Sequence, residues 1–75
     1  MTRLPLVTGQ ELIALLAPLG FVPERQRGSH VYLAHPDGRT TVVPVHRGEQ
    51  LGRGLLRAIL RDAGLTVDDY LRLRG

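Results

Sequence analysis

The amino-acid sequence predicts an α+β domain of order α-β-β-β-α, followed by a short third helix. Apolar residues recur at helical spacing near both ends of the chain and alternate with period two between them. A Pro36-Asp37-Gly38 turn separates two of the alternating stretches, which is typical of a β-hairpin. With 75 residues the chain is expected to form one domain over 1–75, in which a three-stranded antiparallel sheet carries the helices on one face.

The first helix is expected from about Gly9 to Leu19. Thr8 and Glu11 occupy the positions of a capping box, in which the Thr8 hydroxyl accepts from the Glu11 amide and the Glu11 carboxylate reaches back. Gly20 follows where a left-handed C-terminal cap is required. Polar residues and prolines interrupt the apolar run near the N-terminus, so we assign this segment to the folded domain and not to a secretion signal.

Three strands are expected in the middle of the chain, over Phe21–Gln26, His30–His35 and Arg39–His46. Pro23 and Pro44 each lack an N–H for the ladder, so the first and third strands are expected at the edges of the sheet, and Pro23 also indicates an irregular strand. In the second strand, Val31 and Leu33 are expected to face the helices. His30 and Tyr32 then lie on the opposite face, which no helix covers.

A loop rich in glycine and charge over 46–54 leads to the second helix, which ends at Gly64. The expected apolar stripe of this helix consists of Leu55, Leu56, Ile59, Leu60 and Ala63. Thr66-Val67-Asp68-Asp69 then caps the third helix, which carries Tyr70 and Leu71.

The charge balance favours an anionic partner. All ten basic residues are arginines, the formal net charge is +3 and the isoelectric point is about 10.6. Arginine binds phosphate in a bidentate manner, so nucleic acid is the first candidate. A GC-rich genome also accounts for the missing lysines, but not for the positive balance. The chain has no cysteine and no membrane-spanning run, and we expect a cytoplasmic protein.

His30 is the most suggestive residue for chemistry. It begins a strand directly after Arg27-Gly28-Ser29, so its ring is expected to be anchored by the sheet and open to solvent. A histidine near its ordinary pKa exchanges protons at neutral pH. Arg27, together with the amides and hydroxyl of Gly28 and Ser29, can hold a phosphate beside it. The alternative is an ordinary exposed strand histidine after a turn.

A second basic feature is the row of Arg53, Arg57 and Arg61 on the second helix. Their spacing of four residues places them along one face. A phosphate backbone would neutralise this row, and Arg53 near the helix start can also present free amides to a phosphate. The alternative is a solvated helix face.

The three histidines do not predict a metal site. His30, His35 and His46 share no tight ligand spacing, and acidic residues around them are few. No cofactor or metal is therefore expected. His35 is expected to end a strand beside the turn. The glycine-rich loop lacks the Lys-Ser/Thr of a nucleotide-binding P-loop.

Several ordered motifs resemble the HicA toxins of bacterial type II toxin–antitoxin pairs. These motifs are Gly20-Phe21-Val22, Arg25-Gln26-Arg27-Gly28-Ser29-His30, His35-Pro36-Asp37-Gly38-Arg39, Val43-Pro44-Val45-His46 and the stretch 54–65. The resemblance implies a fold like that of double-stranded-RNA-binding domains. It also implies cleavage of mRNA, with the catalytic histidine at His30, and a HicB antitoxin that covers this site.

The resulting hypothesis is a metal-independent endoribonuclease in which His30 acts as general acid and base. Arg27 and Arg47 are expected to hold the scissile phosphate, and Arg53 and Arg57 to contact the RNA backbone. His46 is the only candidate for a second acid or base. The alternatives are a non-catalytic RNA-binding module of the same fold and a protein-interaction domain without RNA affinity. All three readings allow an acidic antitoxin as partner.

Overall fold

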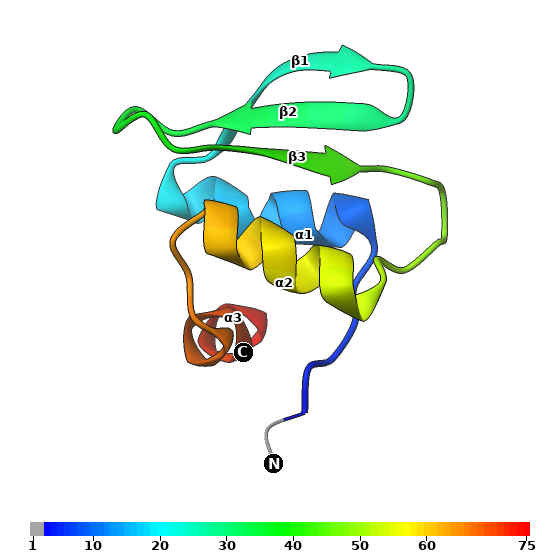
Figure 1. Cartoon of the computed structure of the whole chain (residues 1–75), viewed down its shortest axis with the longest axis vertical. Coiled ribbons are helices and arrows are strands. Elements are labelled where there is room, and N and C mark those ends of the chain that lie inside the picture. Colours follow the sequence, from blue (N-terminus) through cyan, green and yellow to red (C-terminus); the bar gives the residue numbers. More distant parts are fainter. Residues whose placement is uncertain (1–2) are drawn as a thin grey trace.

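Figure 1 shows a sheet that forms one layer and two helices that lie against one of its faces. This computed structural model describes residues 3–75, so residues 1 and 2, which the expected domain includes, lie outside the described residues. The elements in order are α1 (Gly9–Leu16), the 3-10 helix η1 (Ala17–Leu19), β1 (Val22–Arg27), β2 (His30–Ala34), β3 (Thr40–Pro44), α2 (Arg53–Asp62) and α3 (Val67–Arg74). The predicted α+β class and element order are confirmed.

Helix α1 begins at the predicted capping box. The Thr8 amide donates to Glu11 Oε1 at 2.8 Å, and the Glu11 amide donates to Thr8 Oγ1 at 3.1 Å. The α-helical part ends at Leu16 and the last turn tightens into η1, which contains Pro18 and therefore lacks one N–H donor. Gly20 closes this end with the expected left-handed conformation, φ 104°.

The sheet is an antiparallel meander of order β1-β2-β3, which confirms both proline-containing strands as edges. The expected irregularity at Pro23 is confirmed as well, because the register shifts between Pro23 and Arg25 and leaves Glu24 without a partner. Strand β1 has the expected length but is shifted by one residue, β2 is one residue shorter than expected, and β3 is three residues shorter. Beyond β3, the Val45 amide donates to the Ser29 carbonyl at 2.6 Å and continues the pairing past Pro44.

The core lies between the sheet and the helices. Strand β2 contributes Val31 and Leu33, as predicted, and β3 contributes Thr41 and Val43. The helices contribute buried side chains at Leu12, Leu16, Leu56, Ile59, Leu60 and Ala63. The assignment of Leu55 to this stripe is wrong. Leu55 is 43 % exposed, because it lies on the side of α2 that turns toward the 46–52 loop.

Helix α3 lies beyond α1 and α2, on their side away from the sheet (Figure 1). This helix begins at the second capping box of the chain, which Thr66 and Asp69 form as predicted. Tyr70 is fully buried, and its hydroxyl donates to the Pro5 carbonyl. Leu4 and Val7 of the N-terminal segment join the same core, a contribution that the sequence pattern did not indicate.

Candidate functional site

His30 is the first residue of β2 and lies between the two edge strands. Its register partners are Arg27 of β1 and Pro44 of β3. The residue is exposed, although the next residue, Val31, is buried in the core. The backbone of His30 is therefore fixed by the sheet while its side chain is open to solvent, as the sequence analysis expected.

The turn before His30 is held at both of its carbonyl groups. Gly28 has a φ of 56° and Ser29 has no positive φ, the pattern of a two-residue type II′ hairpin turn. Gln26 Nε2 donates to the Gly28 carbonyl at 3.0 Å, and the Val45 amide donates to the Ser29 carbonyl. Apart from its two chain neighbours, no residue has an atom within 4 Å of the place where a Cβ of Gly28 would be, so this side of the turn is open.

The 46–52 loop lies next to this turn. The β1–β2 turn, this loop and the first turn of α2 are all on the same side of the molecule in Figure 1. The end of β3, the loop and Leu55 line a pocket of about 210 Å³, and His46 is part of its wall. Both His46 and Arg47 are exposed. The structure thus brings the expected phosphate-binding residues to the end of the sheet where the β1–β2 turn and the 46–52 loop lie. These residues are Arg27, Gly28, Ser29 and Arg47.

Arg53 is the first residue of α2 and belongs to the same side. Its N-cap, Gly52, offers no side chain to the amides of the first helical turn. No atom lies within 4 Å of the place where a Cβ of Gly52 or of Gly54 would be. This open helix start is the kind of site that the sequence analysis expected for a phosphate.

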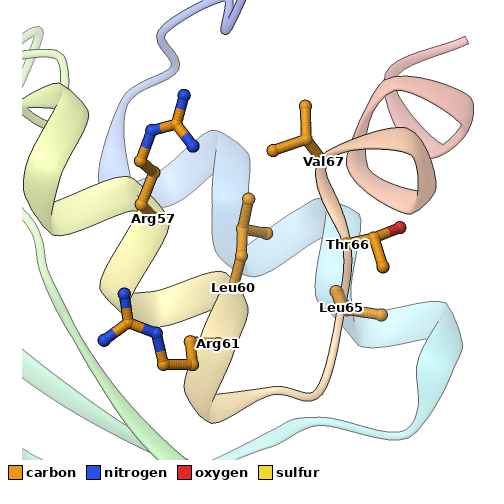
Figure 2. A pocket seen from close by; sticks show the side chains of 6 residues that line it. All are labelled: Arg57, Leu60, Arg61, Leu65, Thr66 and Val67. Carbon is orange, nitrogen blue, oxygen red and sulfur yellow. The ribbon is translucent and has the colours of Figure 1, made fainter.

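Arg57 lies elsewhere. Together with Arg61 it lines a pocket of about 290 Å³ between α2 and the start of α3 (Figure 2). Leu60, Leu65 and Val67 form the apolar part of its wall. The structure therefore groups Arg57 with Arg61, whereas Arg53 is close to the 46–52 loop.

His35 has a structural role at the far end of β2. Its Nε2 lies 2.8 Å from the Leu19 carbonyl and must donate to it, and its Nδ1 accepts from the Asp37 amide at 3.1 Å. Its ring also contacts Phe21, with 5.0 Å between the ring centroids. Nδ1 also lies 2.9 Å from Asp37 Oδ1, and these contacts together explain why His35 is half-buried.

Most arginines are free of carboxylate partners. Among the arginines of residues 3–75, only Arg39 and Arg72 form ion pairs with carboxylates, to Asp37 and Asp69. The Arg39 amide lowers the pKa of Asp37, and the Thr66 amide lowers the pKa of Asp69. No carboxylate of residues 3–75 therefore pairs with the arginines near His30, which are available to an external anion.

Residues 3–75 show neither a cluster of metal ligands nor a membrane-spanning helix. Residues 3–75 contain no group of three or more histidine, cysteine or acidic side chains arranged to hold a metal ion. No helix among them is long and apolar enough to span a bilayer.

One contact between two side chains was not predicted from the sequence. The guanidinium of Arg25 lies over the ring of Tyr32, with Cζ 4.4 Å from the ring centroid. The pair depends on the strand register, which the sequence pattern did not define. Pro23, as a marker of an irregular strand, was the one signal that pointed to this region.

The fold and this arrangement define a class of protein. A three-stranded meander with two helices on one face is the architecture of double-stranded-RNA-binding domains, and here it presents an exposed histidine among arginines. A family model described as the HicA toxin of bacterial toxin–antitoxin systems matches residues 9–65. The chain belongs to this family and is the toxin of a toxin–antitoxin pair. A comparison with curated proteins found no match.

Proposed function

We propose that this toxin is an endoribonuclease that cleaves mRNA without a metal ion, with His30 as the catalytic residue. One observation carries the proposal: His30 is fixed by strand pairing on both sides while its ring remains exposed beside an accessible turn. A general base must be held within reach of the proton that it takes, and an anchored, exposed imidazole meets this requirement. Membership of the toxin family supports a destructive activity of this kind.

The reaction is a transfer of the phosphoryl group within the RNA. His30 takes the proton of a ribose 2′-hydroxyl, and the resulting oxygen attacks the adjacent phosphorus. The bond from phosphorus to the 5′-oxygen of the next nucleotide breaks, and this oxygen receives a proton from the imidazolium or from water. The products are a 2′,3′-cyclic phosphate and a 5′-hydroxyl end. His46, in the wall of the neighbouring pocket, is the candidate for a second acid.

The scissile phosphate is held by the residues around the turn. Arg27 is the register partner of His30, and the turn between them is open where a Cβ of Gly28 would lie. Guanidinium groups and oriented amides stabilise the charge that accumulates on the phosphate oxygens in the transition state. Arg47 contributes a further guanidinium from the adjacent loop. Arg53 and Arg57 bind phosphates further along the RNA.

The alternative is a non-catalytic module that binds RNA with the same surface. The architecture itself favours this alternative, because it occurs widely in proteins that bind RNA without cleaving it. The two proposals differ at His30. A binding module retains its function when the imidazole is lost, whereas the nuclease does not.

The antitoxin is proposed to be a HicB-like protein that covers His30 and so blocks access of RNA. The unpaired arginines around the site favour a partner with acidic side chains at the contact. A cytoplasmic location is proposed as well, because the proposed substrate is mRNA.

A substrate with one cleavable bond tests the proposed reaction. The substrate is a single-stranded DNA that contains one ribonucleotide, incubated with the purified chain in the presence of EDTA. The nuclease cuts on the 3′ side of the ribonucleotide and leaves a 5′-hydroxyl end, and the all-deoxy strand stays intact. Binding of the RNA sequence without cleavage of either RNA or the single-ribonucleotide strand would favour the binding module.

A further inference from the structure

Tyr32 and Arg25 form a contact on the face of the sheet opposite the buried side chains of Val31 and Leu33. They are register partners across β1 and β2, and the Arg25 guanidinium lies 4.4 Å from the centroid of the Tyr32 ring. Tyr32 is only half-buried although it lies in the central strand of the sheet. An aromatic ring and a guanidinium that remain accessible are the two side-chain groups on which unpaired nucleobases stack.

A β-bulge in β1 determines which side chains of this strand lie on the same face as Tyr32. Before the bulge Pro23 pairs with Leu33, and after it Arg25 pairs with Tyr32, so that Glu24 is the extra residue. Without the extra residue the register would continue unchanged, and Glu24 would lie opposite Tyr32. A shift of one residue moves every following side chain to the other face. The bulge therefore brings Arg25 and Arg27 to the same face as His30 and Tyr32.

The space next to this pair can hold a planar group. A hollow of about 430 Å³ lies on the sheet, with Arg25 and Tyr32 in its wall. Glu24 and Thr40, which also line it, are exposed and supply a carboxylate and a hydroxyl for the polar edge of a base. The hollow combines a stacking surface with hydrogen-bonding groups, as nucleobase sites do.

The spacing between His30 and Tyr32 along β2 connects this hollow to the proposed reaction. His30 and Tyr32 are two residues apart on one face of β2, which is about 7 Å along the strand. This is a distance that a ribose and its base span. A phosphate held at His30 and Arg27 thus has a neighbouring base within reach of Tyr32.

We propose that Tyr32 and Arg25 form a stacking platform for an unpaired nucleobase next to the bond that is cleaved. The inference rests on the proposed function and narrows its substrate class. The substrate is RNA whose base beside the scissile phosphate is free to leave its own stack, which a continuous duplex does not provide. Tyr32 and Arg25 are substrate-binding residues, and neither takes part in proton transfer.

The test uses single-ribonucleotide substrates, in which the position of the cleaved bond is known. An abasic residue is placed in turn at the ribonucleotide and at each neighbouring position, and kcat/KM is measured for each substrate. Loss of the stacked base is expected to lower kcat/KM about tenfold at one position. Tyr32→Leu is expected to cause a similar loss with the intact substrate and no further loss with that abasic substrate, because both changes remove the same contact.

Four further variants complete the experiment. Tyr32→Phe keeps the ring and is expected to retain kcat/KM within about twofold, since stacking needs only the aromatic face. Arg25→Gln is expected to lower kcat/KM, whereas Arg74→Gln on α3 serves as the charge-matched control. Val22→Ala, at the far end of β1, is the control for a change on an exposed strand.

The outcomes separate the two proposals. If the wild-type chain cleaves but the effects of Tyr32→Leu and the abasic residues multiply independently, or are absent, the platform is refuted and the nuclease stands. If no substrate is cleaved, both proposals fail. If Tyr32→Leu leaves cleavage unchanged but weakens the complex with the antitoxin, this face is a protein interface and the platform is again refuted.

Discussion

Two histidines of this chain, His30 and His35, lie in the same strand region and have opposite surroundings. His30 is exposed, whereas His35 donates to the Leu19 carbonyl, accepts from the Asp37 amide and contacts Phe21. Residues with such contacts contribute to stability, and exposed residues without them are free to serve chemistry.

This contrast predicts opposite phenotypes. His35→Ala is expected to lower the free energy of unfolding by about 2 kcal/mol, since it removes two hydrogen bonds of about 1 kcal/mol each. His30→Ala is expected to change it by less than about 0.5 kcal/mol. Urea denaturation of both variants measures this difference. An equal loss of stability in the two variants would mean that His30 has structural contacts that the structure does not show.

At this scale the sequence predicted what depends on near neighbours. Both capping boxes, the left-handed Gly20 and the exposure of His30 follow from patterns of a few residues, and all are observed. The role of His35 was not predicted, because its partner Leu19 lies 16 residues away. Likewise, the contact of Arg39 with the Ala63 carbonyl at the end of α2 joins residues 24 apart.

Among the elements, α1 and β3 approach each other most closely at Gly9. A Cβ on Gly9 would lie 2.1 Å from the Pro44 carbonyl oxygen, which is backbone and cannot move aside as a side chain does. Pro44 is the register partner of His30. The start of α1 therefore supports the strand on which the proposed site is built.

Substitution of this glycine tests the packing. Gly9→Ala is expected to destabilise the chain by about 1–3 kcal/mol, because the added methyl group forces helix and strand apart. Gly54→Ala is the matched control in the first turn of α2, where a Cβ meets nothing within 4 Å. The control is expected to stabilise by roughly 0.5–1 kcal/mol, since alanine favours the helix. Thermal unfolding of both variants checks the prediction, which is wrong if Gly9→Ala is as stable as wild type.

The strand register marks the limit of prediction from the sequence. Strands β2 and β3 alternate between buried and half-buried residues, so their faces could be predicted. All six residues of β1 are exposed, and no burial pattern indicates which residue faces which side. Pro23 predicted an irregular edge strand, but the place of the extra residue, and with it the Arg25–Tyr32 contact, depends on pairing in three dimensions.

In the whole molecule, the segment around Pro5 packs against α3 on the side of the helices that is away from the sheet. The Tyr70 hydroxyl donates to the Pro5 carbonyl across 65 residues of sequence, and both segments lie away from the proposed site. The family match ends at residue 65, before α3 begins. The molecule therefore separates a stabilising layer, formed by α3 and the N-terminal segment, from the sheet that carries the candidate residues.

The positive charge of the molecule gives a prediction about salt. Because the arginines near His30 have no carboxylate partners, RNA affinity is expected to fall as salt rises, linearly in a double-logarithmic plot. Arg53→Gln is expected to reduce the magnitude of this slope by about 1, as loss of one phosphate contact does. Fluorescence anisotropy with a labelled single-stranded RNA and the His30→Ala background measures the slope. An affinity independent of salt would contradict a phosphate-binding surface.

His30 is proposed to perform the chemistry of this toxin, and a comparison of three proteins tests this role. Wild type, His30→Ala and the surface control Val22→Ala are incubated with a defined single-stranded RNA in EDTA, after their folding has been verified. Wild type and Val22→Ala are expected to cleave the RNA and leave 5′-hydroxyl ends, whereas His30→Ala is expected to lose at least about a hundredfold in rate. Equal cleavage by His30→Ala and wild type would contradict this role.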